Sequence, residues 1–137
     1  MVDQSRVLAK LDELSGYLKE IKALLPAGAK AYPNAAVKRA CERLLQLCVE
    51  CTIDISKKFL IGNKLGIPVD EIDVLEKLKQ AGILSSEMLS KLRKMRGLRN
   101  ILVHEYADVD DQMVFDVIIN RLNDFEEFAM EVKKALK

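Results

Sequence analysis

The spacing of apolar residues constrains this chain most strongly, because it follows the period of an α-helix along most of its length. After Pro33, apolar side chains recur every three or four residues from Val37 to Phe59, with charged residues between them. Only three prolines and six glycines interrupt the 137 residues, and no segment alternates apolar and polar residues as a half-buried strand does. Long helices joined by short loops are therefore expected.

Start and stop signals divide the chain into five helical segments. Pro26, Gly28 and Gly82 mark helix ends, and Asp70 is a suitable N-cap. The helices are expected at residues 2–25, 34–62 and 71–80, then from Ser85 or Ser86 onward, and from Asp110 or Asp111 to Ala135. This order predicts an all-α, up-and-down antiparallel bundle of four to five helices in one domain over residues 1–137.

The charge balance restricts the possible partners. The net charge is only +1, which argues against a globally basic nucleic-acid binder. Any attraction to RNA must be local, and the basic run from Lys91 to Arg99 is the candidate. The chain has no apolar run of about 20 residues and no signal-peptide core near its start, so we expect a cytoplasmic protein without membrane contact.

The three cysteines lie in one helical segment. Their odd number favours a reducing compartment over a disulfide framework. The spacing of Cys48 and Cys51 resembles a redox or zinc pair, but no second ligand pair and no histidine lies nearby. We expect Cys41, Cys48 and Cys51 to be small buried side chains, with no metal site and no cofactor.

One short string concentrates the residues that can carry chemistry. Residues 99–106 read Arg-Asn-Ile-Leu-Val-His-Glu-Tyr and contain His104, the only histidine. On a regular helix Asn100 and His104 stack on one face. Arg99 and Tyr106, seven residues apart, are nearly aligned, and Arg99 is expected on the flank beside His104. All four polar groups are thus expected to border one strip.

An imidazole beside a guanidinium suits phosphodiester cleavage. His104 can move protons near neutral pH, and Arg99 can hold a phosphate with two hydrogen bonds. A ribonuclease without a metal needs a base for the 2′-hydroxyl, a cation for the phosphate and an acid for the leaving oxygen. One histidine cannot be base and acid at once, so we expect a symmetric homodimer whose two copies share a cleft. Arg93, Lys94 and Arg96 are the expected RNA contacts.

The same string resembles a family signature. Residues 99–106 match the R-x(4)-H-x-Y pattern of HEPN-domain toxins of the HepT family, and Asn100 matches the polar residue that usually follows the arginine there. Further similarity covers most of the chain, in order, at residues 42–46, 50–51, 82–84, 95–98 and 124–128.

The resemblance implies a fold, an activity and a partner. The fold is a helical homodimer with a composite ribonuclease cleft, and the catalytic residues are Arg99, His104 and Asn100. The substrate is RNA rather than DNA. The partner is a minimal nucleotidyltransferase antitoxin that transfers AMP to Tyr106. An added phosphate would bring charge and bulk to the place where the RNA phosphate sits.

Two other interpretations of the same residues stay open. In the first, the chain is a non-catalytic module that binds nucleotide, or is the substrate-binding companion of a nucleotidyltransferase. In the second, it is a helical bundle that only binds other proteins, and residues 99–106 serve packing alone. Glu50 and Asp54, four residues apart on the second helix, either form a solvated polar seam or supply one carboxylate that orients Arg99 or His104.

Overall fold

The computed structural model describes residues 1–136, and all of the regular secondary structure in that range is helical. That range forms six α-helices and one short 3-10 helix, and no strand. They are α1 (Gln4–Leu24), α2 (Ala35–Gly62), α3 (Glu71–Gln80), α4 (Ser86–His104), η1 (Tyr106–Asp108), α5 (Asp111–Asn120) and α6 (Asn123–Ala135). The predicted all-α bundle is confirmed. Lys137, the last residue of the expected domain, lies outside the described residues.

Polar side chains begin the helices where the sequence signals place them. Asn34, Asp70 and Ser85 each accept a hydrogen bond from the backbone N–H three residues further on. For α5 the cap is Asp110 rather than Asp111, and its carboxylate accepts two backbone N–H groups. These caps satisfy donors that a helix start leaves without partners, which explains why the observed starts follow the sequence closely.

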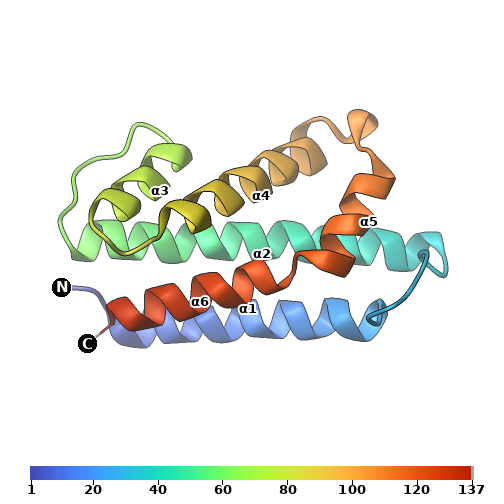
Figure 1. The fold of residues 1–137 in the computed structure, drawn as a ribbon, viewed down its shortest axis with the longest axis horizontal. Coiled ribbons are helices and arrows are strands. Elements are labelled where there is room, and N and C mark those ends of the chain that lie inside the picture. The colour runs from blue at the N-terminus through green and yellow to red at the C-terminus, as the bar shows by residue number, and fades with distance from the viewer. Residues whose placement is uncertain (137) are drawn as a thin grey trace.

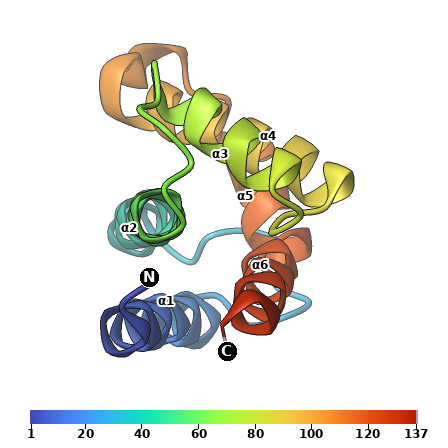
Figure 2. The ribbon, with the colours of Figure 1, turned by 90° about the vertical axis from the view of Figure 1, so that its left-hand side faces the viewer.

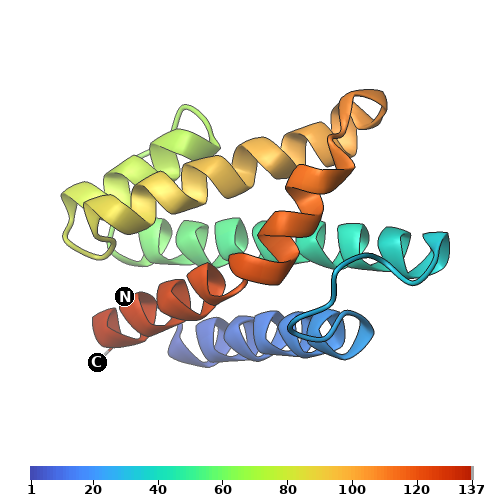
Figure 3. The same cartoon turned by 45° about the vertical axis from the view of Figure 1, so that its right-hand side comes forward.

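The last predicted helix is divided in two, which corrects the expectation of one helix reaching Ala135. α5 ends at Asn120 and α6 begins at Asn123, because Arg121 leaves the helical conformation at φ −124° and ψ 4°. Figures 1 and 3 show that the two helices meet at an angle. The bend lets α6 pack along α1 while α5 crosses α2 near the end of α4. The burial of apolar side chains against other helices therefore sets the direction of the chain at this point.

α2 lies in the middle of the bundle. Figure 2 shows α1 and α6 on one side of it and α3 and α4 on the other. Buried apolar side chains from all six helices form one continuous core, with Phe59 of α2 and Phe125 and Phe128 of α6 among its largest fully buried members. No helix within residues 1–136 combines the length and the apolar character that a membrane span requires.

The cysteines belong to this core, as predicted. Cys41, Cys48 and Cys51 are free thiols and all three are buried. Burial raises the pKa of Cys48 to about 12 and that of Cys51 to about 11. The thiols of α2 are therefore packing groups and stay protonated at neutral pH.

Candidate active site

The string of residues 99–106 lies where α4 ends. α4 stops at His104 because Glu105 adopts φ −135° and ψ 44°, and η1 then returns Tyr106 to the side of α2. Asn100 is half-buried, and its side chain makes no hydrogen bond within residues 1–136. This end of α4 therefore presents two different surfaces, one facing α2 and α3 and one facing solvent.

Carboxylates from two other helices hold Arg99. Its side chain is only 12% exposed, one of its terminal nitrogens bonds to Glu71 of α3, and the other lies 3.8 Å from Glu50 of α2. Arg96, three residues earlier, donates its Nε–H to the same Glu71 oxygen at 2.9 Å. The Arg99 side chain is thus fixed in orientation before any substrate arrives.

Glu71 is ionised in this arrangement. Burial by itself favours the neutral carboxyl, but the hydrogen bonds and charges of Arg96 and Arg99 outweigh it and hold the pKa of Glu71 below its usual range. The buried Nε of Arg99 has no hydrogen-bond partner in the described chain. This donor of Arg99 is therefore unused, and it is closed to solvent in this arrangement.

Of the two acids considered on the second helix, only Glu50 reaches the motif. Glu50 also accepts a hydrogen bond from Gln46 at 3.0 Å, which fixes its position beside Arg99. Asp54 points the other way and lies 3.7 Å from Lys10 of α1. Asp54 thus pairs with α1 and makes no hydrogen bond or ion pair with residues 99–106 in the described chain.

His104 stands apart from Arg99. Its side chain is exposed, and it forms no hydrogen bond or ion pair within residues 1–136. Five residues along a helix rotate a side chain by about 140°, so the two groups point in different directions from α4. The expectation that Arg99, Asn100, His104 and Tyr106 border one strip stays a prediction. Arg99 is tied to α2 and α3 and Tyr106 to α2, while the His104 side chain has no partner within residues 1–136.

Tyr106 is tied to α2 through a buried acid. Its hydroxyl donates a hydrogen bond to Glu42 Oε1 at 2.7 Å, while the residue as a whole is half exposed. This hydrogen bond first, then partial burial and the charge of Glu42, raise the pKa of Tyr106. The phenol therefore remains protonated at neutral pH in the resting chain.

The predicted RNA contacts differ in their availability. Arg93 and Lys94 are exposed and form no ion pair within the described range, so both can meet a phosphate backbone. Arg96 is one-quarter exposed and bound to Glu71. Its charge contributes to the local field, but its guanidinium is already engaged.

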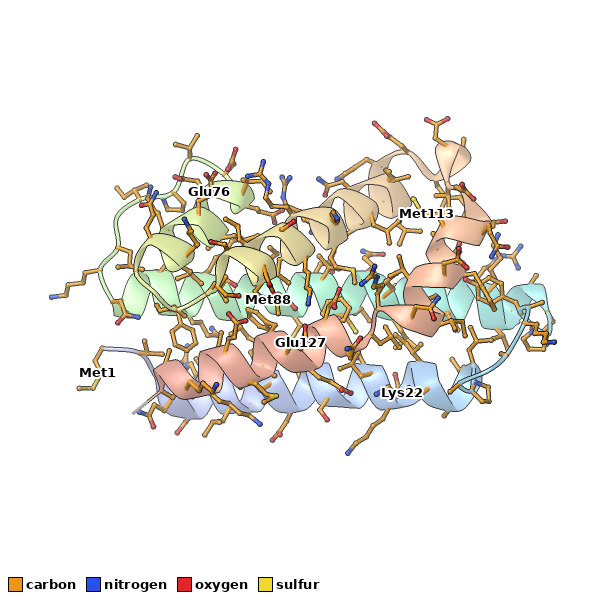
Figure 4. The ribbon with its side chains drawn as sticks, in the orientation of Figure 1. Met1, Lys22, Glu76, Met88, Met113 and Glu127 are labelled. Atoms are coloured by element: carbon orange, nitrogen blue, oxygen red, sulfur yellow. The ribbon has the colours of Figure 1, made fainter. Side chains whose placement is uncertain are left out.

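An apolar groove of about 640 Å³ runs between α4 and α5. Its apolar lining includes Leu98 and Ile101 of α4 and Met113 and Val117 of α5. Met113 is 43% exposed and lies at the end of the bundle where α4 stops (Figure 4). Ile101 is the last residue of α4 in the lining, and His104 follows it by three residues along the helix.

The arrangement suits proton transfer at a phosphate. A preoriented guanidinium, a free imidazole and unpaired cations occur within one stretch of α4. The residues described up to 136 contain no cluster of three or more acidic, histidine or cysteine side chains placed to hold a metal ion.

Sequence reasoning missed Glu71 and did not single out Glu42. Glu42 carried a usable signal, since it lies on the buried face of α2 between Cys41 and Leu45.

Comparison with known proteins finds one matching family and relatives that are similar over most of their length. The family described as Ribonuclease HepT-like matches residues 14–132. The chain is 29% identical to the mRNA nuclease HepT of Shewanella oneidensis over 127 residues, 93% of this chain and 96% of that protein. It is also 29% identical to the tRNA nuclease HepT of Aphanizomenon flos-aquae over 128 residues, 93% of this chain and 87% of that one.

A solved structure shares the fold closely. The structure of the tri-AMPylated HEPN toxin of Shewanella oneidensis in complex with its MNT antitoxin superposes with a TM-score of 0.88 at 29% identity, over 98% of this chain and 99% of that one. The matched family region contains the whole string at the end of α4 and both helices that supply its carboxylates. The chain belongs to the Ribonuclease HepT-like family.

Proposed function

We propose that the chain is a metal-independent endoribonuclease toxin that acts in the cytoplasm as a homodimer and is silenced by AMP transfer to Tyr106. The observation that carries the proposal is the complete string, with Arg99 fixed by carboxylates and His104 free, in a member of a ribonuclease family. The relatives that the chain resembles along most of their length are named as nucleases of mRNA and of tRNA, which supports RNA as the substrate.

Each residue of the string has a distinct task in this proposal. Arg99 binds the scissile phosphate and stabilises its extra negative charge in the transition state, with Glu71 and Glu50 keeping the guanidinium in place. His104 transfers the proton of the 2′-hydroxyl or of the leaving 5′-oxygen. Asn100 positions the RNA or the imidazole.

A second copy completes the site. One His104 cannot serve as base and acid in the same step, and this side chain is exposed three residues after Ile101, which lines the apolar groove between α4 and α5. Packing that groove against a second copy would bury Ile101 and Met113 and bring the two His104 side chains to a shared cleft. The open cations Arg93 and Lys94 would then guide RNA into it.

The proposed partner is a minimal nucleotidyltransferase antitoxin. The support is the likeness to the AMPylated toxin in complex with its MNT antitoxin, together with the half-exposed Tyr106 at the edge of the motif. A phosphodiester on Tyr106 adds negative charge and volume at the edge of the string whose Arg99 is proposed to bind the RNA phosphate. Modification and substrate binding thus exclude each other.

Cleavage of an RNA transcript by the purified chain in EDTA tests the enzymatic role. His104→Ala is expected to reduce the rate at least about 100-fold, and Arg99→Lys is expected to reduce it strongly because lysine lacks the planar pair of donors. Lys133→Ala, an exposed change on α6, is the control and should keep the wild-type rate. Full activity of the His104→Ala chain would contradict catalysis and favour the nucleotide-binding companion.

A further inference from the structure

Glu42 is a buried acid for which the ribonuclease reaction has no use. It lies on α2, is 6% exposed, and accepts the Tyr106 hydroxyl hydrogen at 2.7 Å through Oε1. Its other oxygen, Oε2, is fully buried and has no hydrogen-bond partner within residues 1–136. Burying a carboxylate with an unused oxygen is costly, so a structural role alone explains it poorly.

A cation and a second unpartnered polar group lie around Glu42. Lys38, one turn earlier on α2, forms an ion pair with Asp111 at 3.1 Å. Its pKa is raised first by that hydrogen bond and also by the charges of Glu42 and Tyr106, so the ammonium lies close enough to interact with both. The buried Tyr32 hydroxyl, also without a hydrogen-bond partner in the described chain, is near the same carboxylate. Glu42 is therefore an acceptor with a cation beside it.

Two unpaired guanidinium groups flank the phenol. Arg39 and Arg43 line, with Glu42 and Tyr106, a groove of about 330 Å³ between α2 and the end of α4. Both arginines are exposed, and neither forms a hydrogen bond or ion pair within the described residues. They are four residues apart, so they project from one face of α2. The groove thus combines a nucleophile, an acceptor for its proton and two sites for phosphate.

We propose that Glu42 is the general base for AMP transfer to Tyr106, and that Arg39 and Arg43 bind the phosphates of the incoming adenine nucleoside triphosphate. The inference rests on the proposed function, because it concerns the modification of the same tyrosine. The chain then supplies catalytic groups for its own silencing, and the nucleotidyltransferase supplies the nucleotide.

The transfer of AMP to Tyr106 needs one bond formed, one bond broken and one acceptor for the phenolic proton. The phenolic oxygen of Tyr106 forms a bond to the α-phosphorus of ATP, the bond from that phosphorus to the bridging oxygen breaks, and pyrophosphate leaves. The phenolic proton passes to Glu42 Oε1, which already accepts it in a hydrogen bond. Since the environment raises the pKa of Tyr106, little phenolate exists at neutral pH, and the proton must leave as the bond forms.

The test measures transfer rates by intact mass, with full-length chain, ATP, Mg²⁺ and the nucleotidyltransferase of its own gene pair, between pH 6 and pH 9. Glu42→Gln keeps the size and an acceptor oxygen but cannot take the proton. We expect transfer at least about 100-fold slower at pH 7, rising with pH as hydroxide replaces the base, while the wild-type rate changes little. A double variant, Arg39→Gln with Arg43→Gln, should raise the ATP concentration needed for half-maximal rate without changing the pH profile.

Two further variants keep the result interpretable. Glu126→Gln removes a half-exposed carboxylate on α6 and should keep the wild-type rate and profile. Glu42→Asp keeps a carboxylate and should show the wild-type profile at a reduced rate. Cleavage of RNA by each unmodified variant reports that it is folded.

Each outcome decides the question. A Glu42→Gln chain modified at the wild-type rate and with the wild-type profile overturns the base role and assigns proton removal to the transferase. If the Gln variant does not fold, a Glu42→Asp rate that climbs steeply with pH overturns it equally. Absence of any adduct on the wild-type chain instead refutes the modification itself, which separates the failure of this inference from the failure of the proposed function.

Discussion

Glu71 of α3 binds Arg99 of α4, and the same carboxylate oxygen accepts the Nε–H of Arg96. Arg99 is thus held from a ten-residue helix that packs on α2 and α4. α3 contributes no residue of the string, yet it sets the direction in which Arg99 points.

This contact makes the stability of the chain depend on pH in a defined window. The pKa of Glu71 is lowered in the folded chain, so its contribution is complete above the unfolded glutamate pKa of about 4.3 and is lost as the pH falls through the folded value. Glu71→Gln should therefore cost about 1–2 kcal/mol at pH 7 and much less near pH 3. Urea unfolding at both pH values measures the difference.

Glu76→Gln is the matched control for that experiment. Glu76 lies on the same helix and forms no hydrogen bond or ion pair within residues 1–136, so its replacement should change the free energy of unfolding by less than about 0.5 kcal/mol at either pH. Equal effects of the two variants at pH 7 would show that Glu71 does not hold the arginines in solution.

Mixed dimers test whether the cleft is shared. If both His104 side chains act in one cleft, a mixture of wild-type and His104→Ala chains made together in equal amounts should keep about one quarter of the activity of an all-wild-type preparation, because only one dimer in four retains both imidazoles. The measurement is RNA cleavage at fixed total protein. Retention of about one half would indicate that each chain acts independently.

The thiols of α2 should resist alkylation in the folded chain. Cys48 and Cys51 are buried, and burial raises their pKa values to about 12 and about 11, so neither forms appreciable thiolate at pH 7.5. Intact mass after iodoacetamide should show no adduct without denaturant and three adducts in urea. Rapid labelling of the folded chain would instead reveal frequent opening of α2.

Gly62 should be required for the packing of the N-terminal segment. A Cβ at this position would lie 2.6 Å from the Cα of Val2, which is backbone and cannot give way locally. Gly62→Ala should therefore destabilise the chain by about 1 kcal/mol or more, as read from thermal unfolding. Gly16→Ala is the control: it is exposed in α1 with open space around it, and should stabilise by about 0.5–1 kcal/mol. A loss of stability in both variants would contradict the steric explanation.

Local signals predicted the helices well, because caps and breakers act over a few residues. Asp70 and Gly82 bracket α3, and Asn34 starts α2, as their side chains and conformations require. The break between α5 and α6 left no such signal. Ile118 and Leu122 continue the apolar spacing across it, and only the packing of the whole bundle selects the bend.

The residue types of the candidate site could be read from the sequence, but the partners that hold them could not. The string contains Arg99, His104 and Tyr106 within eight residues. Their partners Glu71 and Glu42 come from other helices, 28 and 64 residues away from the groups they bind. In the sequence Glu71 is simply an acid in the first turn of a helix, a position that the helix dipole favours anyway.

The single exposed His104 at the end of α4 has a consequence for dosage. If a second copy completes the site, as proposed, the active form exists only after association, and activity at low concentration should rise with the square of the chain concentration. A tenfold increase in the number of unmodified chains would then raise RNA cleavage about a hundredfold.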